Sequence, residues 1–270
     1  MTAIVRGEWL KLRTTAIPWV LAGIAVVITG LFILVYFLNH GAGGGGSGGG
    51  SAFVPNDWGA PHPGYPHTTT QLRDLVGRGL TGYIFALLLG VLIITVEFRH
   101  KTATTSFLVT PRRWQFVLGK LLMAALAAIG LAVLLLAVTV VGGGIAVVAQ
   151  GGSFGSLLGQ LGAVAPGLIL VFVLFALLGV GVGSLVTNQV AALIICLGWF
   201  LIVENIIEAI WHGTVKWLPT GAASAAANVT AGRDADFGLF NWWQGSLLIL
   251  AYGLVFAAIG SFVLARRDIT

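Results

Sequence analysis

Six long apolar stretches, separated by shorter polar segments, run along the 270 residues of the chain. A hydrocarbon core about 30 Å thick is crossed by roughly 20 apolar residues of α-helix, and most of the stretches reach this length. The pattern therefore predicts six transmembrane helices, at residues 17–38, 79–96, 111–149, 161–186, 190–211 and 244–265.

Composition agrees with a chain that lies in lipid. Hydrophobic residues make up 57% of it and charged residues only 9%, whereas soluble domains carry about 25% charge. The apolar stretch that begins at Ile17 is too long for the core of a cleavable signal peptide, so we expect it to remain as a helix. The only cysteine, Cys196, lies inside the fifth stretch and is expected to pack as a small hydrophobic side chain. We predict an all-α integral membrane protein with one transmembrane domain over residues 1–270.

The lysines and arginines predict the orientation, because cytoplasmic loops of membrane proteins are enriched in them. Ten fall on the side that holds both termini and four on the other. Residues 1–16, 97–110 and 266–270 are therefore predicted to be cytoplasmic. The formal charge of +5 is explained by this asymmetry and by attraction to anionic lipid, and nothing in it indicates nucleic-acid binding. The ten are Arg6, Lys11, Arg13, Arg99, Lys101, Arg112, Arg113, Lys120, Arg266 and Arg267.

Two long segments are predicted to lie outside the cell, in water. Residues 39–77 contain the run GAGGGGSGGGS, whose glycines indicate a flexible tether and whose composition is also that of an engineered linker. The histidines of this segment lack cysteine or clustered acidic partners, so solvated side chains are favoured over a metal site. Residues 212–243 contain Pro219 and the small-residue run GAASAAANVTAG.

The polar stretch EFRHKTATTSFLVTPRRW, residues 97–114, joins the second and third apolar stretches. Thr110 and Pro111 are a favourable helix start, and a residue before proline avoids the helical conformation. Lys101–Val109 is therefore a short separate segment, too short to be a stable helix alone. Two interpretations stay open: it docks onto another protein, or it lies against lipid headgroups while the arginines anchor the helices.

The order of these features resembles the permease subunits of ABC-2 type transporters. The resemblance covers nearly the whole chain: a basic amphipathic start (GEWLKLRTT), six spans with both ends inside, the stretch EFRHKTATTSFLVTPRRW, and a third span entered through Gly119-Lys120. Its most specific part is residues 97–120. It implies an N-terminal amphipathic interfacial helix and a short cytoplasmic coupling helix between spans two and three.

The resemblance also implies partners. The coupling helix would sit in a cleft of a separate cytoplasmic ATPase, present in two copies, and a second permease chain, identical or related, would complete the path. The residues implied in ATPase coupling are Lys101, Thr102, Thr104, Thr105, Phe107, Leu108, Arg112 and Arg113, with support from Glu97 and Arg99.

ATP and Mg²⁺ would be bound by the partner, because no G-x-x-x-x-G-K-[ST] motif occurs in this chain. We expect no catalytic residue, cofactor or metal site here. The segment GVGVGS (Gly179–Ser184) superficially resembles a nucleotide-binding motif, but it lies in an apolar stretch, where small residues let helices approach closely.

Three polar residues near the end of the fifth apolar stretch are candidates for the translocation path. Val190–Val203 would give only about 21 Å of helix, so this span must continue past Glu204 and Asn205, and Glu208 falls one turn further on the same face. Carboxylates within a membrane usually face a bundle interior or a wet cavity. The alternative is a plain solvated helix end, which the re-entrant helices of the resembling family would produce.

The predicted function is export of a hydrophobic or amphiphilic molecule across the cell membrane. A proton-coupled secondary transporter that uses Glu204 and Glu208 is the main alternative, since membrane glutamates can carry protons. A non-transporting membrane scaffold is a further alternative. An intramembrane enzyme is disfavoured, because the apolar stretches lack a Ser/His or His/Asp grouping.

Overall fold

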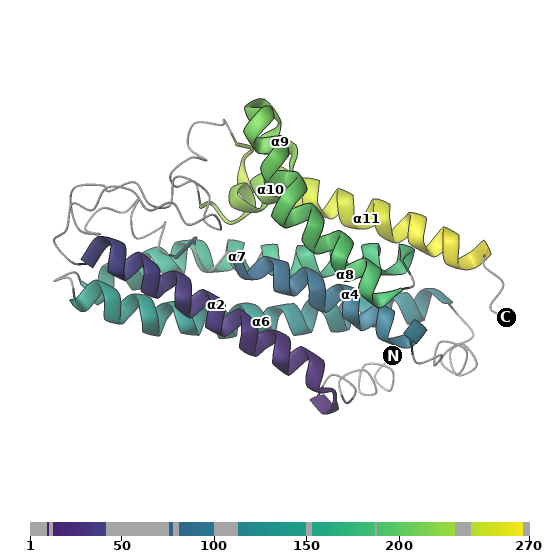
Figure 1. The fold of residues 1–270 in the computed structure, drawn as a ribbon, viewed down its shortest axis with the longest axis horizontal. Coiled ribbons are helices and arrows are strands. Elements are labelled where there is room, and N and C mark those ends of the chain that lie inside the picture. Colours follow the sequence, from purple (N-terminus) through teal and green to yellow (C-terminus); the bar gives the residue numbers. More distant parts are fainter. Residues whose placement is uncertain are drawn as a thin grey trace.

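The computed structural model describes residues 10, 13–41, 76–77, 81–99, 113–149, 153–186, 188–229 and 239–266, and these form helices joined by short connections. The all-α prediction is confirmed for this part of the chain. In order, the helices are α2 (Ala16–Gly41), α4 (Tyr83–Arg99), α6 (Arg113–Ala149), α7 (Phe154–Leu185), α8 (Gln189–Gly198), η2 (Trp199–Val203), α9 (Glu204–Ile210), η3 (His212–Trp217), α10 (Pro219–Ala226) and α11 (Trp242–Arg266) (Figure 1).

Within these residues, five helical segments are long and apolar enough to cross a membrane, which makes the chain a multi-pass membrane protein. The second predicted span, 79–96, corresponds to α4, whose apolar part, Tyr83–Val96, is shorter than the other five. The amphipathic N-terminal segment and the coupling segment lie largely or wholly outside the described residues. The five segments are Ala16–Val35, Leu118–Ala149, Phe154–Leu185, Gln189–Ile210 and Trp242–Gly260.

Helix α7 is the centre of the bundle and packs against α4, α6 and α11. Its contact with α4 is made backbone to backbone: a methyl group at Gly179 would overlap the carbonyl oxygen of Leu87, and one at Gly90 would overlap that of Ala176. On the other side of α7, a methyl group at Gly181 would lie 3.0 Å from Cβ of Phe256 in α11. The interpretation of GVGVGS as a packing segment is confirmed.

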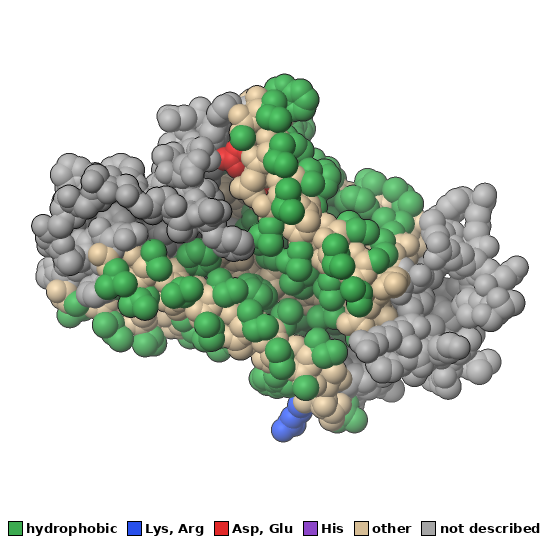
Figure 2. All heavy atoms as spheres, in the orientation of Figure 1, with side chains coloured by type: hydrophobic (Ala, Val, Ile, Leu, Met, Phe, Trp, Pro, Cys, Tyr) green, Lys and Arg blue, Asp and Glu red, His purple; other side chains and the backbone are tan. Residues whose placement is uncertain are grey.

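The outer surface of the described helices is apolar. Figure 2 shows hydrophobic side chains over most of the described part of one face. Helix α2 is the least covered, with Trp19 64% and Val27 68% exposed. Such large apolar side chains would be unfavourable in water, so they are expected to contact lipid or another membrane protein.

The start of α2, the end of α4, the start of α6 and the end of α11 lie toward the same end of the bundle (Figure 1). Residues 100–112 therefore connect α4 to α6 at the end of the bundle where α2 begins and α11 ends. Lys120, counted among the cations at this end, is 2% exposed, so its aliphatic stem and amine lie inside the protein.

One prediction is corrected by the fold. The region 212–243 was expected to lie outside the cell without a fold of its own, and its location stays a prediction, but its first half forms η3 and α10, and α10 is buried against α11 and α7. The reason is the small size of its side chains: the helix has no bulky face to hold it away from its neighbours. Its buried residues are Gly221, Ala222, Ala223, Ala225 and Ala226.

Candidate functional site around Glu204

The fifth span is one helical stretch, Gln189–Ile210, with a change of winding in the middle. It begins with a capped turn, in which Oδ1 of Asn188 accepts hydrogen bonds from the backbone amides of Val190 (3.0 Å) and Ala191 (3.3 Å). Because α7 ends at Leu185 and α8 begins at Gln189, the two helices form a tight hairpin at the end of the bundle opposite α9.

The change of winding is η2, a single turn of π-helix over Trp199–Val203. The amide of Glu204 bonds to the carbonyl of Trp199, five residues back instead of four. The side chain of Asn205 supports the turn, since its Nδ2 donates to the carbonyl oxygens of Phe200 (3.3 Å) and Leu201 (3.0 Å). Single π-turns within α-helices occur frequently at functional sites.

Glu204, the first residue after the π-turn, is 2% exposed. One carboxylate oxygen, Oε1, accepts a hydrogen bond of 3.0 Å from Nε1 of Trp199. The other, Oε2, is buried and has no hydrogen-bond partner among the described residues. Burying a carboxylate whose oxygens are incompletely hydrogen-bonded is unfavourable, so the neighbours of Glu204 decide how well the site tolerates it.

Residues from two other helices and the next turn of α9 surround this carboxylate. Thr220, at the start of α10, lies beside it and interacts with it through both its hydroxyl and its backbone, at a geometry looser than that of the Trp199 hydrogen bond. Glu208 and the phenol of Tyr252 in α11 lie within electrostatic reach of it. The site is therefore formed where α9, α10 and α11 meet.

The chain reaches this arrangement by folding back after α9. Pro219 stands in the first turn of α10, where a proline is favourable, and a methyl group at Gly245 of α11 would lie 2.5 Å from the carbonyl oxygen of Ala222. The hydroxyl of Tyr252 donates a 2.8 Å hydrogen bond to the carbonyl oxygen of Trp217, which ties η3 to α11. In Figure 1, α9 and α10 lie together at one side of the bundle, beside the start of α11.

An aromatic cluster holds the inner side of the π-turn. The ring of Phe200 lies 5.6 Å from that of Phe175 in α7 and 6.2 Å from that of Tyr83 in α4, measured between centroids. The rings of Tyr83 and Phe175 are 4.4 Å apart. Because Phe200 belongs to the π-turn, this cluster fixes the turn that directly precedes Glu204.

The three polar residues predicted at this end differ in their surroundings. Glu204 is buried, Glu208 is half-buried, and Asn205 is exposed with its amide bonded to its own helix. The assignment of these residues to a translocation path stays a prediction. Sequence reasoning did not find Trp199, Thr220 or Tyr252, because a lone tryptophan, threonine or tyrosine in an apolar stretch carries no signal for a carboxylate partner.

The predicted coupling residues cannot be placed in the same way. Glu97 and Arg99 belong to the last turns of α4 and Arg113 begins α6, but their side chains are not described. The others, which lie outside the described residues, are Lys101, Thr102, Thr104, Thr105, Phe107, Leu108 and Arg112.

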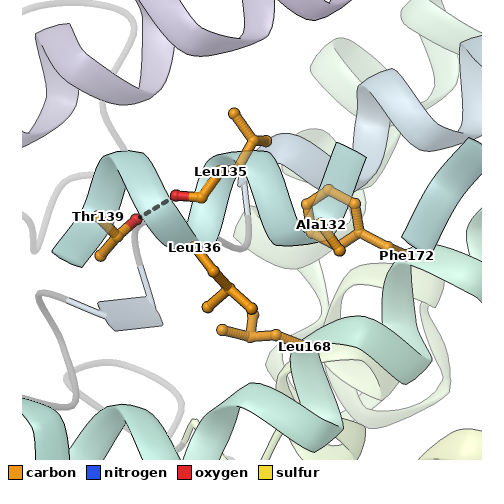
Figure 3. A pocket seen from close by; sticks show the side chains of 6 residues that line it. All are labelled: Ala132, Leu135, Leu136, Thr139, Leu168 and Phe172. Atoms are coloured by element: carbon orange, nitrogen blue, oxygen red, sulfur yellow. Dashed lines mark hydrogen bonds between the residues drawn. The ribbon is translucent and has the colours of Figure 1, made fainter. Parts of the chain in front are cut away.

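A small pocket lies between α6 and α7, and unlike the Glu204 site it is lined almost entirely by apolar side chains (Figure 3). Its cavity volume of about 10 Å³ leaves room for no more than about one water molecule, far less than a ligand pocket needs. The hydroxyl of Thr139, its one polar side-chain group, donates to the carbonyl oxygen of Leu135 at 2.9 Å. We assign this pocket to packing. It is lined by Ala132, Leu135, Leu136, Thr139, Leu168 and Phe172.

In the part of the chain that the structure describes, no three His, Cys, Asp or Glu side chains lie together as metal ligands would. Cys196 is buried in the main hydrophobic cluster. No protein-family model matches the chain, and no curated protein matches its sequence.

Proposed function

We propose that this chain is the membrane-spanning permease subunit of an ATP-binding cassette exporter. It would move a hydrophobic or amphiphilic molecule out of the cytoplasm across the cell membrane. The ATP and Mg²⁺ would be bound by two copies of a separate cytoplasmic ATPase, and a second permease chain, identical or related, would complete the path.

The observation that carries the proposal is the position of the basic stretch between α4 and α6. It joins two membrane helices at the end of the bundle where α2 begins and α11 ends. Ten of the 14 lysines and arginines are assigned to that end, which favours a cytoplasmic location for it and for both termini.

The packing of α4 supports a mechanical role for this stretch. Gly90 and Gly179 bring the backbones of α4 and α7 into direct contact, and α6 packs against the same central helix. A push on the connection between α4 and α6 would therefore be transmitted to α7 without being absorbed by flexible side chains.

In this proposal α4 crosses the membrane as well, which brings the number of spans to six. Its 17 residues give about 26 Å of helix, slightly less than a bilayer core of about 30 Å. A short central helix is acceptable because α4 contacts other helices and little lipid: Leu87 and Val91 are completely buried.

The proposal is tested by co-purification and ATPase activity. The chain is solubilised from its native membrane in mild detergent, and the accompanying ATPase activity is measured for wild type and for a variant in which Lys101–Val109 is replaced by nine Gly/Ser residues. A matched control replaces residues 59–67, predicted to lie on the other side, in the same way. The expected result is an ATPase that accompanies wild type and the control and is lost from, or uncoupled in, the first variant. If no ATPase accompanies the intact chain, the proposal is overturned.

Burial of Glu204 favours one second candidate, a proton-coupled transporter. A buried carboxylate inside a membrane span can take up and release a proton during transport. Transport by such a protein would survive depletion of ATP and would stop when the proton gradient is collapsed. The permease proposal expects the opposite result for each treatment.

A further inference from the structure

We propose that the buried Lys120 of α6 forms an ion pair with Glu97 of α4, and that this pair holds together the two helices that carry the basic stretch of residues 100–112. As a statement about pairing, the inference can be measured without any ATPase. As a statement about how a push from that stretch reaches the bundle, it rests on the proposed function.

The first argument is the burial of Lys120. Its side chain is 2% exposed near the start of a long apolar span, and it has an interaction partner. Ionisable side chains inside membrane spans usually pair with one another or with backbone carbonyls, and a buried ammonium without an anion is strongly unfavourable. Burial also keeps this amine away from lipid headgroups, so its partner belongs to the protein.

The second argument is the side of α6 on which Lys120 stands. Residues three or four apart lie on the same side of a helix, and Lys120 continues a row of buried residues with this spacing. The row belongs to one hydrophobic cluster with residues of α4, so the side of α6 that carries Lys120 faces α4. From α6 the cluster includes Ala124, Ala128, Ala132 and Leu135, and from α4 it includes Ala86, Leu89 and Ile93.

The third argument is the level of Glu97 along this contact. The two helices run in opposite directions, and a methyl group at Gly82, directly before α4, would overlap the side chain of Leu135. Glu97 lies 15 residues after Gly82. Lys120 lies 15 residues before Leu135, so both are about 22 Å from that contact, toward the same end. Glu97 also follows Ile93 by one helical turn, which places it in the row of α4 that faces α6.

The fourth argument is the scarcity of carboxylates. Among the helices that the structure describes, only α4 and α9 contain Asp or Glu. Figure 1 shows α9 away from the end of the bundle where α4 ends and α6 begins. Glu97 is therefore the one acidic residue of the described helices that stands at the level of Lys120.

The pair would close the base of the connection between α4 and α6. Glu97 stands two residues before the end of α4, and Lys120 stands seven residues after the start of α6. The alanines of the facing rows can slide past one another, whereas two opposite charges in a surrounding of low dielectric constant hold one register. A push on residues 100–112 would then move α4 and α6 as one unit against α7.

The first test is cross-linking of Glu97→Cys to Lys120→Cys in a Cys196→Ala background. A short bis-methanethiosulfonate reagent is applied to membranes that contain the chain, and the linked peptides are identified by mass spectrometry. The matched control pairs Val96→Cys with Lys120→Cys, because position 96 lies about 100° further around α4. We expect several-fold more cross-linking from position 97 than from position 96.

The second test is a double-mutant cycle on the thermal unfolding of the purified chain in lipid nanodiscs. Glu97→Gln and Lys120→Met each leave one buried charge alone and should each lower the melting temperature by at least about 5 °C. The double variant removes both charges and should melt within about 2 °C of wild type. The matched control is Lys216→Met, at a half-buried lysine over the ring of Phe240, which should lower the melting temperature by no more than about 2 °C.

Either of two results would overturn the pairing. One is a loss in the double variant that equals the sum of the two single losses, and the other is equal cross-linking from positions 96 and 97. If a single variant does not fold, the cross-link decides, because its two cysteines remove both charges together.

The same cross-link tests the mechanical role. If the pair holds α4 and α6 together throughout transport, the ATPase activity that accompanies the chain should survive cross-linking. Activity that stops on cross-linking and resumes on reduction would show that the two helix ends must separate, and would overturn this role. If no ATPase accompanies the chain, the permease proposal fails, and the pairing is still decided by the cross-link and the double-mutant cycle.

Discussion

The hydrogen bond from Trp199 satisfies one oxygen, Oε1, of the buried Glu204 carboxylate. It connects the first residue of the π-turn with the first residue after it. In a regular α-helix, residues four apart lie on one face, and the wider π-turn brings residues five apart into this relation. Local winding of the helix thus determines which side chain Glu204 meets.

Replacing Trp199 with Phe should destabilise the protein by about 1–3 kcal/mol, because Oε1 then loses its donor while it stays buried. The measurement is the midpoint of denaturant unfolding in detergent. Trp211→Phe is the matched control, since Trp211 is 64% exposed, and it should change stability by no more than about 0.5 kcal/mol. Equal effects of the two substitutions would contradict the described hydrogen bond.

Helix α7 contains glycines in tight contact with another helix and glycines with open space beside them, and the sequence does not tell the two kinds apart. Gly179 faces the backbone of α4, where a methyl group would overlap the carbonyl oxygen of Leu87. Gly159 of the same helix has nothing within 4 Å of the position where its Cβ would stand. The sequence shows that glycines are frequent, but only the packing shows which of them are needed.

Gly179→Ala should therefore destabilise the protein by about 1–3 kcal/mol, because the helices must separate to admit the methyl group. Gly159→Ala should be neutral or stabilising by up to about 1 kcal/mol, since alanine favours the helix. Unfolding in detergent monitored by far-UV circular dichroism compares the two. A harmless Gly179→Ala would mean that α4 and α7 are not in backbone contact.

The π-turn leads to a second prediction for an element. A π-turn behaves as an α-helix with one additional residue, so deleting Ile202 should restore regular winding and keep Glu204 near Trp199, now four residues away. Deleting Ile194, in the regular part of α8, should rotate the rest of this helical stretch by about 100° about its axis. This rotation would take Glu204 out of its site. Both isoleucines are exposed.

We expect the Ile202 deletion to yield folded protein with a melting temperature close to wild type and the Ile194 deletion to be much less stable. Size-exclusion chromatography and thermal unfolding of the purified variants measure this. If both deletions are equally harmful, η2 is not an inserted residue in an otherwise regular helix.

The main helices were predictable from the sequence, whereas the site was predictable only in part. Apolar runs long enough for a bilayer predicted helices because lipid leaves the backbone few other ways to satisfy its hydrogen bonds. Glu204 was found because a carboxylate in such a run is unusual. The π-turn was not predicted, because a shift of hydrogen bonds by one residue has no signature in the apolar sequence WFLIV.

The fold of α10 was also missed, for a different reason. Its sequence, PTGAASAA, is neither long nor strongly apolar, so it does not resemble a buried membrane segment. What buries it is close contact with α11, which depends on small residues in both helices, such as Ala222 and Gly245. Contacts between distant segments cannot be inferred from the apolar pattern of either one.

For the whole molecule, the helices alternate in direction, so that α2 starts and α11 ends toward one end of the bundle (Figure 1). The start of α7, next to exposed Ser153, lies toward the opposite end. The distribution of lysines and arginines predicts that the first end faces the cytoplasm.

This orientation is tested with single cysteines in a Cys196→Ala background. An impermeant maleimide applied to intact cells should label Ser153→Cys and should label Thr270→Cys only after the membrane is permeabilised. The two variants are controls for each other, because both carry one cysteine at a polar position. The reverse pattern would show that the chain is inserted in the opposite orientation.

The helices differ so much in length that a bilayer of uniform thickness cannot match all of them if they stand upright. Helix α6 has 37 residues, about 56 Å of helix, whereas α4 has 17, about 26 Å. The last third of α6 still exposes apolar side chains, among them Val141 (63%) and Ile145 (66%). To keep these in hydrocarbon, α6 must tilt strongly or the surrounding lipid must thicken. Hydrophobic mismatch is thus part of this architecture, and the acyl-chain length of the host membrane sets how steeply the α6–α7 hairpin inclines.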